Sequence, residues 1–78
     1  MVKKNILLNS IDRVKVFVNT VSKIDCDMDL AAGRYIVDAK SIMGIFSIDI
    51  SKPIELRIHA SDEEAEKIIE SLKEYIQE

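Results

Sequence analysis

The most constraining pattern in this chain is a strict alternation of apolar and polar side chains over residues 54–60. The apolar set is Ile54, Leu56, Ile58 and Ala60, and the polar set is Glu55, Arg57 and His59. Such alternation predicts a strand with one face in the core, and Pro53 is compatible with its start. Because a chain of 78 residues buries only about 60% of its unfolded surface, every other element must share that core. The sequence therefore predicts a single domain over residues 1–78.

The strand is followed by the clearest helical pattern in the chain. Ser61 and Glu64 have the spacing of a capping box, which marks the start of a helix. Apolar residues then recur at helical spacing, at Ala65, Ile68, Ile69, Leu72, Tyr75 and Ile76. This stripe predicts an amphipathic helix that packs on the core to the end of the chain.

The first half of the chain predicts a strand, a helix and a hairpin. Residues 2–8 indicate a short strand, after which Ser10 is placed to cap a helix with Asp12 in its first turn. The apolar positions of that helix are Ile11, Val14, Phe17, Val18 and Val21. Residues 25–30 then alternate as a strand, residues 31–34 form a turn, and residues 35–37 favour a second strand.

A second serine, Ser41, opens a short apolar segment that stops at Gly44, within the run Lys40-Ser41-Ile42-Met43-Gly44. A serine followed by apolar residues and a glycine is typical of a capped helix. The predicted order of elements is therefore β-α-β-β-α-β-α, which is an α+β arrangement.

Composition excludes several classes of function. The chain has 11 basic and 14 acidic residues and a net charge of −3, so it lacks the positive field that nucleic acids require. No apolar run approaches the roughly 20 residues of a membrane helix. The lone Cys26 and the lone His59 do not provide the spacing of a zinc site, and a single cysteine is typical of a reducing cytosol. We expect a cytoplasmic protein without nucleic acid, membrane, metal or other cofactor.

Two segments of the chain carry a family resemblance, namely Val16-Phe17-Val18-Asn19-Thr20-Val21-Ser22-Lys23 and Val37-Asp38-Ala39-Lys40-Ser41-Ile42-Met43-Gly44-Ile45-Phe46-Ser47. Both resemble HPr, the small phosphocarrier family of the bacterial sugar phosphotransferase system. The resemblance implies an open-faced β-sandwich, in which a four-stranded antiparallel sheet carries three helices on one face.

The residues of the carrier site differ from that family. HPr proteins carry phosphate on a histidine, followed by an arginine and a proline, just before the first helix. Without gaps, these three positions fall on Ser10, Asp12 and Arg13. A serine phosphate is a stable ester and not a transferable phosphoramidate. Ser10 is either only a helix cap or a phosphate acceptor at a helix start. In the second case Asp12, two residues away, disfavours a second anion, and Arg13 offsets that repulsion in part. The alternation predicts that His59 faces solvent on its strand.

The family resemblance gives Ser41 a second interpretation besides helix capping. In Gram-positive relatives a dedicated kinase phosphorylates the serine at this position, and the product recruits a transcriptional regulator. The apolar residues that follow form a docking patch for partner enzymes, which here implies Ile42, Met43 and Phe46, with Met43 and Phe46 as the exposed pair. Lys23 and Lys40 are candidates for basic contacts at its rim.

We therefore expect an HPr-like protein that is not an enzyme and does not transfer phosphate through histidine. It would act as a regulatory protein-interaction module, as a non-carrier homologue does in catabolite repression. The expected partners are HPr kinase, a transcriptional regulator or enzymes of the phosphotransferase system. Two alternatives remain open at this point: a divergent carrier that uses Ser10 or another residue, and a structural subunit whose patch is covered in an oligomer.

Overall fold

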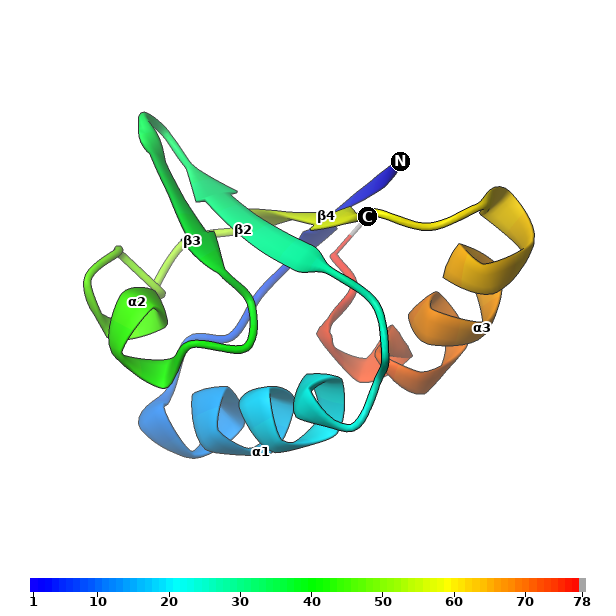
Figure 1. The fold of residues 1–78 in the computed structure, drawn as a ribbon. Helices are drawn as coiled ribbons and strands as arrows, with labels where there is room; N and C mark the ends of the chain where they lie inside the picture. Colours follow the sequence, from blue (N-terminus) through cyan, green and yellow to red (C-terminus); the bar gives the residue numbers. More distant parts are fainter. Residues whose placement is uncertain (78) are drawn as a thin grey trace.

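A computed structural model describes residues 1–77 of the chain. The elements are β1 (Val2–Ile6), α1 (Ile11–Ser22), β2 (Met28–Ala32), β3 (Tyr35–Asp38), α2 (Ile42–Phe46), β4 (Ile54–Ile58), α3 (Asp62–Ser71) and the 3₁₀ turn η1 (Lys73–Tyr75). The predicted β-α-β-β-α-β-α order is confirmed, with η1 as an addition (Figure 1).

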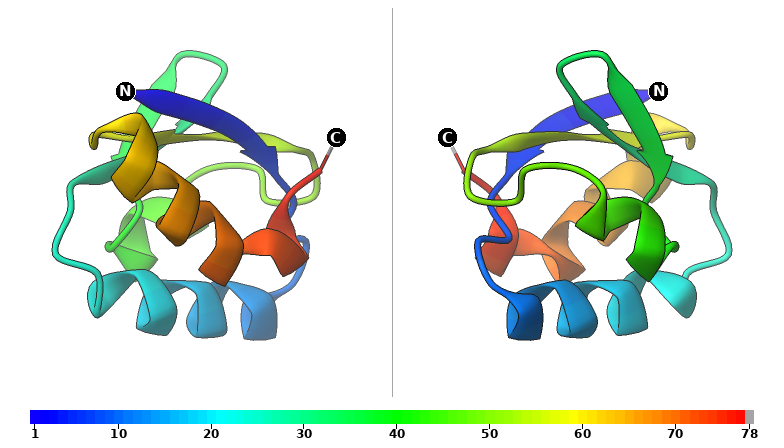
Figure 2. Two further views of the ribbon diagram at one scale, coloured as in Figure 1. Left: turned by 90° about the vertical axis from the view of Figure 1, so that its right-hand side faces the viewer. Right: turned by 90° about the vertical axis from the view of Figure 1, so that its left-hand side faces the viewer.

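The four strands form one antiparallel sheet in the order β1-β4-β2-β3. The helices lie on one face of this sheet and leave the other face open (Figures 1 and 2). This is the α+β open-faced β-sandwich that the family resemblance implied. None of the helices in residues 1–77 has the length and apolar character needed to cross a bilayer.

The core lies between the sheet and the helices. The alternating strand contributes Ile54, Leu56 and Ile58, all of which are buried as predicted. From the helical layer, the Phe17 and Tyr75 rings meet edge to face with their centroids 5.4 Å apart. The other buried side chains of the helical layer are Val14, Val21, Ile45, Ala65, Ile68 and Leu72. The sheet and the helical layer thus share one core, as the short chain requires.

The hairpin is shifted along the chain relative to its prediction. β2 spans Met28–Ala32 and not residues 25–30, because Ala32 pairs directly with Tyr35. The turn is therefore only Gly33 and Arg34, and Gly33 has a φ of 60°, which favours glycine. Gly33 at the first central position, with a negative φ at Arg34, is the arrangement of a type II′ turn.

Two predictions about the helices were wrong, one about a buried face and one about a helix end. Ile11 is 59% exposed, because at 3.6 residues per turn it lies on the flank of the buried stripe of α1. The last helix ends at Ser71 and does not run through Ile76. Ile76 instead forms an antiparallel bridge with Ile6, and this pairing with β1 needs extended backbone.

Candidate functional site

The start of α1, where the sequence resemblance would place a phosphocarrier residue, has a compact geometry. Ser10 is the N-cap of α1, and its hydroxyl accepts a hydrogen bond of 3.1 Å from the Arg13 backbone N–H. The preceding Asn9 has a φ of 51°, and its N–H donates to Ile50 O at 2.9 Å. The serine hydroxyl is thus engaged with the helix start, as a capping role requires.

The Arg13 side chain is held beside this cap by hydrogen bonds to main-chain carbonyls. Its Nε donates to Leu8 O at 2.9 Å, and its Nη2 donates to Leu7 O at 2.9 Å and to Glu74 O at 3.2 Å. The guanidinium carbon also lies 4.8 Å from the centroid of the Tyr75 ring. We expected Arg13 to offset part of the repulsion between Asp12 and a phosphate on Ser10. Its guanidinium donates instead to main-chain carbonyls, so it joins the start of α1 to η1.

Ser41 is the N-cap of α2, as the sequence predicted, and its hydroxyl accepts from the Gly44 N–H at 3.1 Å. Gly44 is held close to two neighbours. A Cβ atom at this position would lie 3.2 Å from Ser41 Oγ and 3.2 Å from Val37 Cβ. The glycine therefore allows α2 to approach β3 closely while its N–H meets the serine cap.

The side chains after Ser41 divide into buried and exposed sets. Ile45 is fully buried and Ile42 is partly buried, whereas Met43 is 76% exposed and Phe46 is 41% exposed. We refer to Ile42, Met43 and Phe46 as the α2 patch. The two side chains that the sequence indicated as the exposed pair of this patch are exposed.

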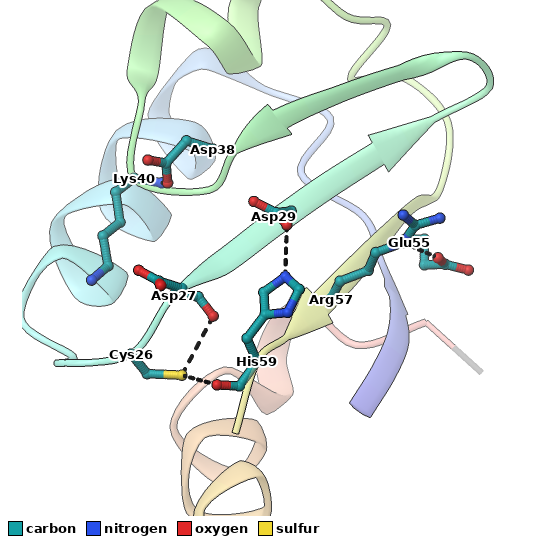
Figure 3. Close-up of polar contacts among 8 residues, drawn as sticks. All are labelled: Cys26, Asp27, Asp29, Asp38, Lys40, Glu55, Arg57 and His59. Atoms are coloured by element: carbon teal, nitrogen blue, oxygen red, sulfur yellow. Dashed lines mark hydrogen bonds and ion pairs between the residues drawn. The ribbon is translucent and has the colours of Figure 1, made fainter. Parts of the chain in front are cut away.

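The two lysines assigned to the rim of this patch differ in their environment. Lys23 is exposed and is the C-cap of α1. The Lys40 ammonium donates to Ile24 O at 2.7 Å, and the Lys40 backbone N–H donates to Asp38 Oδ1 at 2.9 Å. Lys40 therefore holds the loop after α1 against the segment before α2, which limits its reach toward a partner (Figure 3).

His59 follows β4 on the open side of the sheet and has an acidic neighbour that sequence analysis missed. Its Nε2 lies 2.7 Å from Asp29 Oδ2, and a hollow of about 330 Å³ beside it is lined by Asp27, Met28, Asp29, Asp38 and His59 (Figure 3). The aspartates make this hollow unfavourable for an anion such as phosphate. Among residues 1–77, no three histidine, cysteine, aspartate or glutamate side chains are grouped so that they could hold a metal ion.

Cys26 lies at the margin of the same region. Its thiol contacts Asp27 O at 3.4 Å and His59 O at 3.5 Å. Burial raises the pKa of the Cys26 thiol, and the nearby Glu64 carboxylate raises it further. A thiol with a raised pKa is a poor nucleophile at neutral pH, and its contacts are with main-chain carbonyls and not with a base.

The two contacts that sequence reasoning missed both join distant segments. Arg13 and Glu74 are 61 residues apart, and Asp29 and His59 are 30 residues apart. Arg13 occupies the position of the HPr proline, and this departure, together with those at Ser10 and Asp12, was the available signal that the local structure differs there. The Asp29–His59 pair can be predicted only once the register of β2 and β4 is known. In that register Asp29 lies opposite Arg57, two residues from His59.

Comparisons with known proteins agree with the fold, and the family match includes the Ser41 segment. The family model PTS-HPr, described as "PTS HPr component phosphorylation site", matches residues 13–78. The HPr-like protein Crh of Bacillus subtilis is 33% identical over 63 residues, which cover 81% of this chain and 74% of that protein. The family match begins after Ser10 and Asp12, so these two positions lie outside it.

Solved structures of HPr proteins have the same fold. HPr-C-His from Thermoanaerobacter tengcongensis superposes with a TM-score of 0.71 and 31% identity, over 92% of this chain and 90% of that one. The phosphocarrier protein HPr from Bacillus anthracis gives a TM-score of 0.73 and 29% identity, over 97% and 96% of the two chains. With its fold, its Ser41 segment and this match over most of its length, the chain belongs to the PTS-HPr family.

Proposed function

We propose that this protein is a regulatory, protein-binding member of the HPr family that does not carry phosphate for transfer. Partners of the phosphotransferase system, HPr kinase or a transcriptional regulator dock on the α2 patch, and phosphorylation of Ser41 changes that docking. The observation that carries this proposal is the exposure of Met43 and Phe46 on the helix that Ser41 caps. Exposed apolar side chains grouped on one element are typical of interaction sites.

The start of α1 supports a role other than phosphotransfer. Ser10 caps the helix, Asp12 places a carboxylate in the first turn, and the Arg13 guanidinium is bonded to three carbonyl oxygens. A phosphate on Ser10 would meet the charge of Asp12 without a free cation from Arg13. The one histidine of the chain, His59, is paired with Asp29 beside other aspartates.

Ser41 has the chemistry of a regulatory acceptor. In the proposed reaction its hydroxyl oxygen bonds to the γ-phosphorus of ATP, the bond to the β-phosphate oxygen breaks, ADP leaves, and a base of the kinase takes the hydroxyl proton. The product is a stable ester with about two negative charges at neutral pH. Because Ser41 directly precedes the α2 patch, this charge alters recognition of the patch.

The test is intact-mass spectrometry after two parallel incubations, one with phosphoenolpyruvate and Enzyme I and one with HPr kinase and ATP. We expect a single acid-stable phosphate from the kinase, absent in Ser41→Ala and retained in the matched cap variant Ser61→Ala. A label that requires Enzyme I would overturn the proposal in favour of the carrier alternative, with Ser10→Ala identifying its acceptor.

Docking on the α2 patch is tested by NMR: isotope-labelled protein is titrated with HPr kinase or Enzyme I, and the changes in its amide chemical shifts are followed. Met43→Lys should weaken binding at least about tenfold, as truncation of a central contact does. Val16→Lys is the matched control, because Val16 is 53% exposed on α1. Equal affinities of the two variants would contradict docking on α2.

A further inference from the structure

The outer edge of β3 is an unpaired strand edge. β3 is the last strand in the order β1-β4-β2-β3, so it has a partner on one side only. The other end strand, β1, is partly covered by the C-terminal residues, since Leu7 N–H donates to Tyr75 O and Gln77 N–H donates to Asn5 O, both at 2.8 Å. The free edge of β3 is therefore the more open of the two.

The type II′ turn determines which backbone groups face this edge. Ala32 and Tyr35 flank the two-residue turn and form a hydrogen-bonded pair, and by alternation Leu30 and Val37 form the next one. Tyr35 and Val37 thus direct their N–H and C=O groups toward β2. Ile36 directs its own N–H and C=O groups outward, where a further strand can accept and donate.

Exposed apolar side chains occur on β3 and on the neighbouring helix α2. Tyr35 is 67% exposed and Ile36 is 59% exposed on β3, and Met43 and Phe46 are exposed on the adjacent α2. These are four of the seven exposed large apolar side chains in residues 1–77. The right-hand view of Figure 2 shows β3 and α2 together on the side that faces the viewer.

The two charged residues that flank Ile36, Arg34 and Asp38, are complementary between two antiparallel copies of β3. In an antiparallel pairing of two β3 strands centred on Ile36, Ile36 meets Ile36 of the second copy and Arg34 lies opposite Asp38 of the second copy. The two-fold axis produces this ion pair twice, and the outward-facing groups of Ile36 form the central hydrogen-bonded pair. The same register places Tyr35 of one copy opposite Val37 of the other, on the face that α2 covers.

We propose that the occupant of this edge is a second copy of the chain, in a symmetric dimer with β3 paired to β3 about Ile36. The sheet then continues through both copies as eight strands. Two edges of four residues bury less than the roughly 1,200 Å² of a stable interface, so the dimer is weak. We expect a dissociation constant of about 10 μM to 1 mM. This proposal does not depend on phosphorylation of Ser41.

The experiment is sedimentation equilibrium of the full chain from about 10 μM to 1 mM, with Arg34→Asp and Asp38→Arg as opposite charge reversals. Each reversal places like charges opposite each other, so each variant alone should lose self-association by at least about tenfold. An equimolar mixture of the two variants restores two opposite-charge pairs and should form a heterodimer. Lys15→Asp on α1 is the matched control and should associate like the wild-type chain.

Amide spectra of every variant establish that it is folded, and Ile36→Lys serves as a second test should Asp38→Arg fail to fold. Loss of association in Ile36→Lys supports the proposal. A wild-type chain that stays monomeric at 1 mM overturns it. A dimer that neither Arg34→Asp nor Ile36→Lys weakens also overturns the proposal, because its interface would then lie elsewhere.

Discussion

Replacing Arg13 by alanine should be among the most destabilising changes outside the core. The substitution removes three hydrogen bonds from a charged donor, two of them partly buried at 2.9 Å and one exposed at 3.2 Å, and the contact with the Tyr75 ring. Hydrogen bonds from charged groups contribute about 1.5–3 kcal/mol each when buried, and an exposed cation–π contact about 0.5–1 kcal/mol. After a discount for partial exposure, Arg13→Ala should lower the free energy of unfolding by about 3 kcal/mol.

This loss is large for a small domain, whose free energy of unfolding is about 5–15 kcal/mol. It corresponds to a fall in Tm of about 12–24 °C, since 1 kcal/mol shifts the Tm of a domain of this size by about 4–8 °C. Urea unfolding followed by circular dichroism measures the change in free energy directly. Arg13→Lys retains the charge but not the fork of donors, and should lose about half as much.

The matched control is Lys15→Ala, which removes an exposed cation from the same helix and should change stability by less than about 0.5 kcal/mol. Hydrogen exchange adds a local measurement. The amide of Gln77, which donates to Asn5 O at 2.8 Å, should exchange faster in Arg13→Ala, because η1 loses its attachment to α1. A stability of Arg13→Ala equal to that of the control would refute the structural role assigned to this guanidinium.

Three further outcomes are expected. Gly44→Ala should lower the free energy of unfolding by about 1 kcal/mol in urea, because its Cβ would meet Val37 Cβ at 3.2 Å and disturb the cap, outweighing the helix propensity of alanine; an increase would contradict this. Hydrogen bonds from Ser51 lower the pKa of the Asp49 carboxyl, so their stabilisation is present above the unfolded pKa and is lost as the pH falls through the folded pKa. When unfolding is measured between pH 2 and 6, the free energy of unfolding should depend less on pH in Asp49→Asn than in the wild-type chain. An unchanged pH dependence would exclude this contribution of Asp49. Because burial raises the pKa of the Cys26 thiol, alkylation by iodoacetamide at pH 7 should be slower than that of a free cysteine and should accelerate above pH 9; equal rates would count against a buried thiol.

The fold was accessible from the sequence because its main determinants are local. The alternation of residues 54–60 specified the buried face of β4, and the cap serines marked the starts of α1, α2 and α3. The errors occurred at element ends. The shift of β2 to Met28–Ala32 and the early end of α3 at Ser71 both follow from pairing with another strand, which no local pattern reports.

The candidate site was only partly accessible. The Ser41 cap follows from spacing within a few residues, and the exposure of Met43 was implied by the family resemblance; the structure has both features. Lys40 was expected at the rim of the α2 patch, and its ammonium instead donates to Ile24 O, 16 residues away. The position of a long side chain depends on which carbonyl comes within reach after folding, and composition does not contain that information.

The order of elements, most of their buried positions and the absence of a histidine where HPr proteins have one could all be read from the sequence. These properties depend on residue type and on spacings of two to four residues, which backbone geometry translates directly into faces and caps. Three features emerge only after folding: Arg13 binds the carbonyl of Glu74, Asp29 meets His59, and Ile36 points its backbone groups outward. Each of these depends on the strand register or on contacts between distant segments, which form only when the whole chain packs around its core.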